Sequence, residues 1–347
     1  NVKATFVGRK LTGSESSEAK ITSFIIDDEA VVEQPVINEE AGTIVFAVNE
    51  EVESLKFTPI IEISEGATIT PASGVAQDFS NNKKVTYTVT AEDGTVKVYT
   101  AFVEGTRKVL KYSFEDWKEG TKNDELLPKD LWAGSAAGAG ILGGTLLRKE
   151  TREDGTYAAK LITFEYPNEP NSLLVPKITA GSIFIGKFDM MPALQGDRLS
   201  CTKFGLDAET VSLGGKPLRF KGVYKYESGS NYLDASNYED VKPVDIKDKG
   251  QIQAVLYKVQ TGEDGKEIVL TGHDVNTSEL RVAVANIIVE DIKEYTPFNI
   301  EFEYLQEYDR TAKYKFAIIC SSSKDGDLFK GAGGSTLIVD EFEVICE

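Results

Sequence analysis

Alternation of apolar and polar side chains at period two is the feature that most constrains the fold of this chain. It is clearest at Val85, Tyr87 and Val89, which alternate with threonines, and it resumes over residues 96–103. Between the two runs stands Asp93-Gly94, a dipeptide favoured in hairpin turns because glycine readily adopts the positive φ that the turn needs. Similar runs recur along the chain without a convincing amphipathic helix among them. The sequence therefore predicts an all-β protein.

The length and the spacing of these runs predict two domains. The chain has 347 residues, and a domain usually contains roughly 100–200 residues. We expect a polar N-terminal segment over 1–20, an Ig-like β-sandwich over 21–105 and a second domain over 108–347. About 240 residues of short strands are most simply a two-sheet jelly-roll β-sandwich. Its polar loops, notably 227–250 and 321–335, are where we expect functional residues.

The charge of the chain excludes two classes of partner. Lys and Arg number 38 against 56 Asp and Glu, which leaves a formal net charge of −18. Nucleic acids and anionic membranes need clustered basic residues, so we expect neither as a partner. Half of the negative charge lies within residues 1–105. The larger domain is then only mildly acidic, which suits a neutral ligand such as a glycan.

The beginning of the chain bears on its location. No stretch approaches the ~18 apolar residues of a membrane span. The chain starts at Asn1, without Met and without the basic and apolar regions of a signal peptide. This is consistent with removal of a leader, so we expect an exported protein.

Histidine and cysteine restrict the chemistry. His273 is the single histidine, whereas a His-ligated zinc site usually needs two or three. Cys201, Cys320 and Cys346 show no C-x-x-C spacing, so neither a metal knuckle nor a redox pair is expected. Cys320 and Cys346 both follow apolar residues at period two, which favours buried free thiols. A Cys320–Cys346 disulfide is the alternative.

Two short motifs match enzyme signatures in letters but not in context. Residues 138–143 read G-x-G-x-x-G, yet no βαβ unit surrounds them. Residues 321–324 read S-x-x-K, yet they follow a strand instead of lying on a helix. We favour a different interpretation, in which Ser323, Asp325 and Asp327 bind a hard cation or the hydroxyls of a sugar. An ordinary polar loop is the alternative.

Aromatic residues beside polar loops are further candidates for binding a sugar. The apolar C–H face of a sugar ring stacks on Trp or Tyr, while Asp, Asn and Arg bind its hydroxyls. Trp132, Tyr232 and Tyr238 are best placed for stacking, and Arg219 is a candidate for the hydroxyls. For each aromatic residue, packing in the core is the alternative.

Five segments of the second domain carry a family likeness: residues 114–117, 181–186, 217–226, 321–327 and 334–341. Through them the domain resembles the bacterial family named "putative carbohydrate metabolism domain". Residues 70–74 and 85–94 resemble the Ig-like modules that precede such domains in exported surface proteins. The resemblance implies a jelly roll similar to carbohydrate-binding modules and a glycan-related role. It also implies an outer-membrane, periplasmic or cell-surface protein with a lipid anchor attached upstream of Asn1.

The same resemblance implies a structural calcium ion. In jelly-roll carbohydrate-binding modules the first and last strands run side by side and hold Ca²⁺ through their acidic residues. Glu115 and Asp340 are the matching residues here, and Ca²⁺ prefers carboxylate oxygens. The resemblance supplies no catalytic pair.

Three functions remain open. The leading hypothesis is an exported, non-catalytic, two-domain glycan-binding protein. The first alternative is a glycoside hydrolase that uses two carboxylates, although no signature singles out a pair among Glu115, Asp116, Asp325 and Asp327. The second alternative is a structural or adhesive surface protein that binds another protein through an apolar patch.

Overall fold

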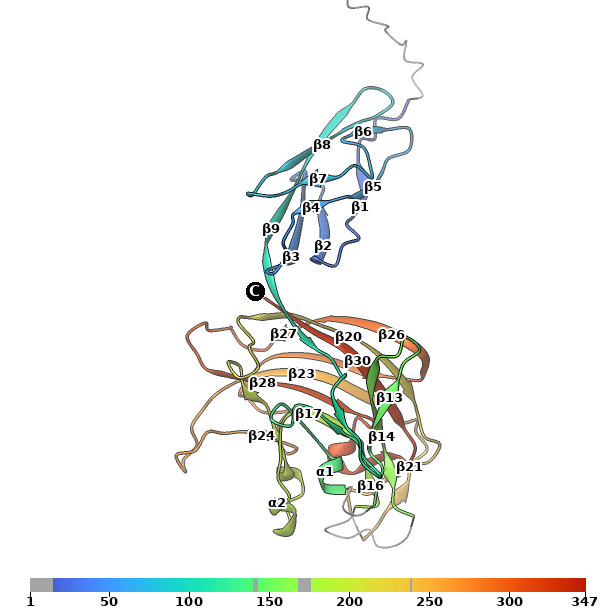
Figure 1. Ribbon diagram of the computed structural model, residues 1–347, viewed down its shortest axis with the longest axis vertical. Coiled ribbons are helices and arrows are strands. Elements are labelled where there is room, and N and C mark those ends of the chain that lie inside the picture. Colours follow the sequence, from blue (N-terminus) through green and yellow to red (C-terminus); the bar gives the residue numbers. More distant parts are fainter. Residues whose placement is uncertain (1–14, 140–142, 168–175, 238) are drawn as a thin grey trace, which may run out of the picture. The chain divides into compact units, whose positions relative to one another are not determined.

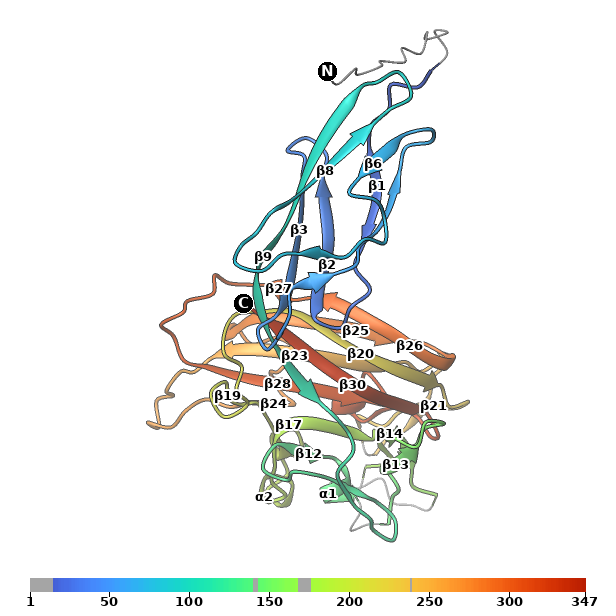
Figure 2. The same ribbon diagram turned by 45° about the horizontal axis from the view of Figure 1, so that its top comes forward.

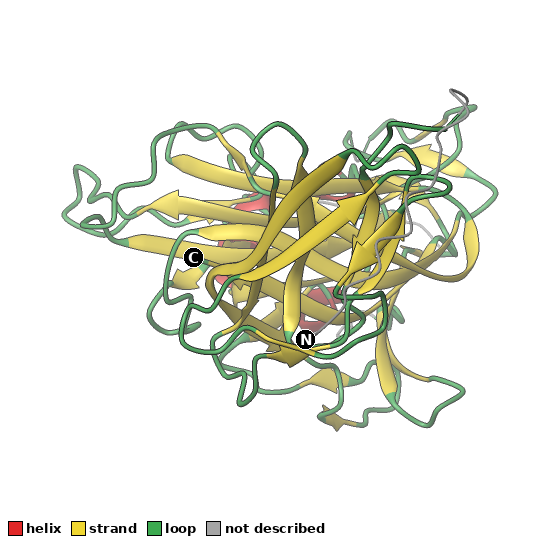
Figure 3. Ribbon diagram, turned by 90° about the horizontal axis from the view of Figure 1, so that it is seen from above, coloured by secondary structure: helices red, strands yellow, loops and turns green. Residues whose placement is uncertain are grey.

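The computed structural model describes residues 15–139, 143–167, 176–237 and 239–347. Strands and loops make up nearly all of it, as Figure 3 shows, so the predicted all-β class is confirmed. Its helical segments are single turns: α1 (Ala136–Ala139), α2 (Met191–Leu194) and 3₁₀ turns at Leu199–Cys201 and Gly326–Leu328. No helix in the described residues is long and apolar enough to cross a membrane.

The chain divides into two compact units between Val109 and Leu110. The division falls within β9, a strand of 17 residues from Val96 to Tyr112. Each unit has its own apolar core, so each is described separately below.

The first unit is a small β-sandwich. Its strands are β1 (Ile21–Ile25), β2 (Val31–Asn38), β3 (Thr43–Asn49), β4 (Lys56–Phe57), β5 (Ile60–Ile63), β6 (Thr68–Thr70), β7 (Gln77–Asp78), β8 (Val85–Thr90) and the first part of β9. The predicted hairpin is present, because β8 and β9 pair antiparallel and Gly94 at the turn has a φ of 91°. The residues with inward parity, such as Tyr87 and Tyr99, are buried in the core of this unit.

The second unit contains two large sheets (Figures 1 and 2). In the first sheet the order is β13 (Leu147–Thr151), β14 (Tyr157–Ile162), β30 (Thr336–Cys346), β20 (Pro217–Glu227) and β26 (Ile292–Glu301). In the second sheet it is β24 (Leu270–Thr271), β18 (Thr202–Phe204), β17 (Ser182–Phe188), β28 (Tyr314–Ser321), β23 (Gly250–Lys258), β25 (Arg281–Val289) and β27 (Glu303–Tyr304). β12 (Trp132–Gly134) also pairs with β17, and β19 (Leu206–Asp207) with β28.

Short strands complete the second unit. They are β10 (Trp117–Lys118) with β11 (Glu125–Leu126), β15 (Phe164–Glu165) with β16 (Ile178–Thr179), and β21 (Tyr232–Asp234) with β22 (Lys242–Pro243) and β29 (Lys330–Ala332).

The second sheet is covered on both faces. On β28, Phe316 and Ile318 belong to the main core that both large sheets share. Ala317 and Ile319 point the other way, into a smaller apolar cluster on the outer face of the sheet. The unit is therefore the expected two-sheet β-sandwich, with an extra layer of loops over one sheet.

The three cysteines are free and buried in the structure. Cys320 and Cys346 lie in the main core, fully shielded from solvent. The expectation of buried free thiols is confirmed, and the alternative disulfide is not formed.

Candidate functional site

A cavity of about 180 Å³ opens on the outer face of the second sheet. Its floor consists of Ser182 from β17, Ile319 and Ser321 from β28, and Gln251 and Gln253 from β23. The residues between them on these strands point into the main core, because successive side chains of a strand face opposite ways. Strands that are distant in sequence thus bring polar groups to one place.

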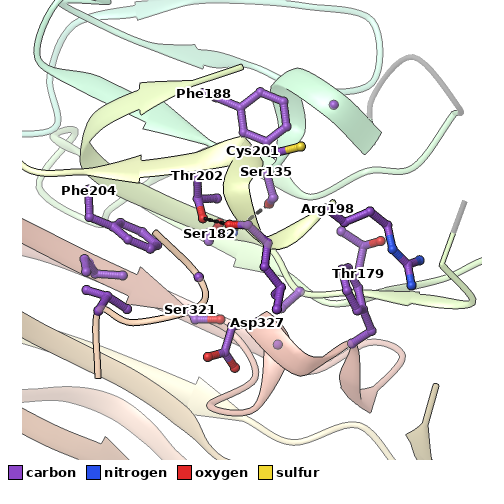
Figure 4. Close-up of a pocket in the computed structure, with 18 of the residues that line it drawn as sticks. Ser135, Thr179, Ser182, Phe188, Arg198, Cys201, Thr202, Phe204, Ser321 and Asp327 are labelled. Atoms are coloured by element: carbon purple, nitrogen blue, oxygen red, sulfur yellow. Dashed lines mark hydrogen bonds between the residues drawn. The ribbon is translucent and has the colours of Figure 1, made fainter. Parts of the chain in front are cut away.

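Loops, single helical turns and the ends of β17 and β18 form the walls of the cavity (Figure 4). The wall residues include Ser135, Gly138, Phe188, Met190, Arg198, Leu199, Cys201, Phe204, Gly272, Val275, Asn276, Lys324, Asp327 and Phe329. Two of these loops are joined, since the Gly272 N–H donates to the Leu199 carbonyl at 3.0 Å. The lining therefore combines aromatic and aliphatic side chains with amides, hydroxyls and a few charges.

Among the described residues, each amide of the floor has one side-chain hydrogen-bond partner. Gln253 donates from Nε2 to Asn276 Oδ1 at 3.3 Å, and Gln251 donates to Asn286 Oδ1 at 2.9 Å. A primary amide has two donor hydrogens and a carbonyl acceptor. Both glutamines therefore keep hydrogen-bonding capacity for a ligand.

Asp327 is the one carboxyl group among the described residues that line the cavity. Burial raises the pKa of Asp327, and a hydrogen bond from the Leu328 backbone opposes this. The neighbouring ammonium group of Lys324 is engaged elsewhere, because its Nζ lies 2.7 and 2.6 Å from the two carboxylate oxygens of Asp325. The Arg198 guanidinium packs over the Phe329 ring, 4.0 Å from its centre.

The expected set of Ser323, Asp325 and Asp327 does not converge. Ser323 is buried and its hydroxyl donates to Asp248, whereas Asp325 accepts a hydrogen bond from the Tyr232 hydroxyl at 3.0 Å. The segment leaves β28 and coils into a 3₁₀ turn, so residues two apart no longer share a face. Of the three, Asp327 alone lines the cavity.

Asp248 anchors the loop that carries Asp327. Its Oδ2 accepts hydrogen bonds from Ser323 Oγ at 2.6 Å, Ser335 Oγ at 2.7 Å and the Ala332 N–H at 2.8 Å. Burial raises the pKa of this carboxyl, although these bonds favour its charged form. Asp248 is only 2% exposed, so it acts on the site by holding the loop.

The other predicted ligand-binding residues do not line the cavity. Trp132 is 6% exposed and packs against Tyr112 and Phe114, so the exposure expected of it is not observed. Tyr232 is 5% exposed, which also leaves no face for a sugar. Arg219 lies on β20 of the first sheet, where it bonds to Asn299 and Glu301 at 2.7 Å. Tyr238 lies outside the described residues.

Gln251 and Gln253 are not among the ligand-binding residues predicted from the sequence. A signal was available, because these amides alternate with Ile252 and Ala254 in a run that is otherwise apolar. A strand buried on both faces has little reason to carry two amides on one side unless that side is functional.

The residues expected to hold calcium do not fit the ion. Asp340 is 3% exposed, and Arg152 NH1 lies 2.6 Å from its Oδ2. Burial raises the pKa of Asp340, and Arg152 opposes that shift. Glu115 is exposed and accepts a hydrogen bond from the Tyr157 N–H at 3.1 Å. Arg152 thus supplies the positive charge at Asp340, and in the described part of the chain no three His, Cys, Asp or Glu residues are grouped to hold a metal.

His273 does not form a catalytic triad. Its Nε2 lies 2.7 Å from Asp197 Oδ1, while Ser200 Oγ donates to Oδ2 of the same carboxylate at 2.6 Å. A triad needs the histidine between the serine and the acid. Here the acid lies between the other two, and the cluster fastens the loop beside the cavity.

Comparison with known families identifies the chain. The family described as "Putative carbohydrate metabolism domain" matches residues 88–345. The chain belongs to this family. A second family, described as "SGBP, N-terminal", matches residues 21–103. Membership confirms the resemblance of the second domain and gives the protein a carbohydrate-related role. No match was found among curated proteins.

Two solved structures are similar over long stretches. A protein of Bacteroides thetaiotaomicron described as a "putative glycoside hydrolase" is 30% identical, with 98% of this chain and 99% of that chain covered and a TM-score of 0.58. A Bacteroides vulgatus protein with the same description is 28% identical, with 69% of this chain and 98% of that chain covered and a TM-score of 0.56.

Proposed function

We propose that this protein is an exported glycan-binding protein whose second unit holds a sugar residue in the cavity on the outer face of the second sheet. The observation that carries the proposal is the mixed lining of that cavity. Phe188, Phe204 and Phe329 offer apolar surface to the C–H face of a sugar ring, and Gln251 and Gln253 offer amides to its hydroxyls.

The size of the cavity favours a small ligand group. Its volume of about 180 Å³ is less than the roughly 300–1,000 Å³ of pockets for drug-sized ligands. We therefore expect it to take one sugar unit, such as a chain end or a side branch, while the rest of a polysaccharide stays outside.

The number of carboxyl groups in the lining of the cavity favours binding of a glycan over its cleavage. Glycoside hydrolases generally use two carboxyl groups about 5–9.5 Å apart. Asp327 is the one carboxyl that the described residues contribute to the lining. Hydrolysis is the second candidate, because both similar structures are described as a "putative glycoside hydrolase".

The test is a binding screen on the full chain. Plant, host and microbial polysaccharides are examined by affinity electrophoresis, and positive samples by calorimetry. We expect at least one to bind, and Gln251→Ala to weaken that binding roughly two- to tenfold, the value of one neutral hydrogen bond. Gln260→Ala, at an exposed amide beyond the same strand, is the control. Binding to none of the polysaccharides would overturn the proposal, and release of reducing sugar would favour the hydrolase.

Export and a lipid anchor upstream of Asn1 are part of the same proposal. They are supported by the resemblance of residues 21–105 to modules of exported surface proteins. Fractionation of cells that produce the whole precursor, with labelled palmitate, tests both. Labelled protein in the outer-membrane fraction is expected, and unlabelled protein in the cytoplasm would contradict the proposal.

A further inference from the structure

The carboxyl group of Asp327 is unusual in its surroundings. It lies in the 3₁₀ turn Gly326–Leu328 and lines a cavity whose walls are largely apolar (Figure 4). Among the described residues, no side chain forms a hydrogen bond or ion pair with it, although the Leu328 backbone and the nearby charge of Lys324 favour its ionised form. A partly buried carboxylate without side-chain partners can accept hydrogen bonds from a ligand.

Among the described residues, the charges at the cavity balance. Arg198 and Lys324 of the lining are positive, Asp327 of the lining and Asp325, which is paired with Lys324 beside it, are negative, and these four groups carry no net charge. Lys324 is paired with Asp325, and Arg198 packs on the Phe329 ring. A ligand that brought its own carboxylate would add an uncompensated negative charge close to Asp327, in surroundings that solvate charge poorly.

The chemistry of an ionised carboxylate then selects the ligand. A carboxylate only accepts hydrogen bonds, and its two oxygens can accept from two neighbouring donors. Adjacent hydroxyls of a neutral sugar ring provide such a pair, and bonds of the type O–H···O⁻ are short and strong. A uronic acid presents an acceptor of the same charge instead.

Resting on the proposed glycan binding, we infer that Asp327 is a specificity residue that makes the cavity select neutral sugars over acidic ones. Its carboxylate accepts hydrogen bonds from a pair of hydroxyls and repels sugars that carry a carboxylate. The apolar walls pack against the ring, and the amides of Gln251 and Gln253 bind hydroxyls on the side of the floor.

The experiment compares matched glycans. Each neutral hexose polymer that binds the full-length wild-type protein is oxidised at C6 to its uronate form, and both forms are measured by calorimetry at pH 7. Three proteins are compared: wild type, Asp327→Asn, and Asp130→Asn, which removes an exposed charge away from the cavity.

We expect the wild type and Asp130→Asn to bind the neutral forms at least tenfold more tightly than the oxidised forms. Asp327→Asn should lose roughly ten- to hundredfold in affinity for the neutral form, as expected for hydrogen bonds to a charged group, and should discriminate less against the oxidised form. A thermal melt checks that the variant is folded.

The outcomes separate the two proposals. If no glycan of any charge binds, glycan binding and the inference both fail. If oxidised glycans bind as tightly as their neutral partners, or if Asp327→Asn behaves as the wild type, the inference fails while glycan binding stands.

Discussion

Replacement of Asp248 by alanine tests the idea that a buried carboxylate holds the site loop. The wild-type carboxylate accepts bonds from Ser323, Ser335 and the Ala332 N–H on Oδ2, and from the Lys249 N–H on Oδ1 at 2.8 Å. Asp248→Ala removes all of these acceptors at once. The segment 322–335 between β28 and β30, which Asp248 holds through these bonds, also carries Asp327. The stability of the protein and its binding of glycans should therefore change together.

The magnitude follows from counting the donors that find no other partner. Ser323 can turn its hydroxyl to Thr163 Oγ1, which lies 2.6 Å away, and the Lys249 amide lies where water can reach it. The Ala332 N–H and the Ser335 hydroxyl belong to residues with no solvent exposure. Two stranded donors at about 1–3 kcal/mol each predict a loss of about 2–6 kcal/mol in the free energy of unfolding. For a unit of this size that corresponds to roughly 4–24 °C in Tm.

Asp248→Asn should cost much less. Its amide oxygen can occupy the position of Oδ2 and keep those three acceptor bonds, so about 1 kcal/mol is expected for the one mismatched contact. Loss of the negative charge in Asp248→Asn should not itself destabilise the fold, because burial raises the pKa of Asp248 in the folded state. The ionised group therefore destabilises the fold relative to its protonated form above that pKa, and the neutral amide avoids this cost.

Urea unfolding of the full chain, followed by circular dichroism and tyrosine fluorescence, provides the measurement. Asp245→Ala is the matched control, because Asp245 is an exposed aspartate three residues before Asp248, and it should change the free energy of unfolding by no more than about 0.5 kcal/mol. If Asp248→Ala were as stable as this control, the network would not hold the loop. If Asp248→Asn lost as much as Asp248→Ala, charge rather than acceptor geometry would be decisive.

Four further predictions concern the second unit. Arg152→Ala should lower the free energy of unfolding by about 3–5 kcal/mol, since it leaves the buried Asp340 carboxylate without its cationic partner. A chelator should leave the Tm of the wild type unchanged, and a lower Tm with the chelator would restore the calcium hypothesis. All three thiols should resist a thiol reagent at pH 8 until the chain is unfolded, because each is buried; a rapid reaction of the native protein would contradict their burial. Burial raises the pKa of Asp327, so its carboxyl group becomes neutral as the pH falls through that pKa. Discrimination against C6-oxidised glycans should therefore fade on acidification. Discrimination that did not change with pH from 7 down to 4 would refute the role of the Asp327 charge.

The calcium hypothesis illustrates where sequence likeness stops. The resemblance singled out Asp340 as a ligand of Ca²⁺, and in the structure this carboxylate is buried, where a charge must be compensated. The partner is Arg152, which lies 188 residues earlier in the chain and reaches Asp340 through the β13–β14 hairpin. No spacing rule relates these two positions, so the sequence could not distinguish an arginine from an ion.

The aromatic candidates show a second limit. Trp132 and Tyr232 stand beside polar loops in the sequence, yet both lie in short strands and are buried. For Trp132, the rings of Tyr112 and Phe114 provide the cover. Nearness to a polar loop therefore did not predict exposure, whereas Asp327, in the same sequence context, does face the cavity.

The amino-acid sequence by itself determined the all-β class, the Asp-Gly hairpin and the family. These depend on the alternation of apolar and polar side chains at period two, on glycine's backbone freedom and on local motifs, all of which act within a few residues. Only the tertiary structure decided that Ser182, Gln251, Ser321 and Asp327 lie around one cavity. The reason is the order of strands in the sheet: β17, β28 and β23 are neighbours although they lie far apart along the chain, and pairing across such distances leaves no period in the sequence.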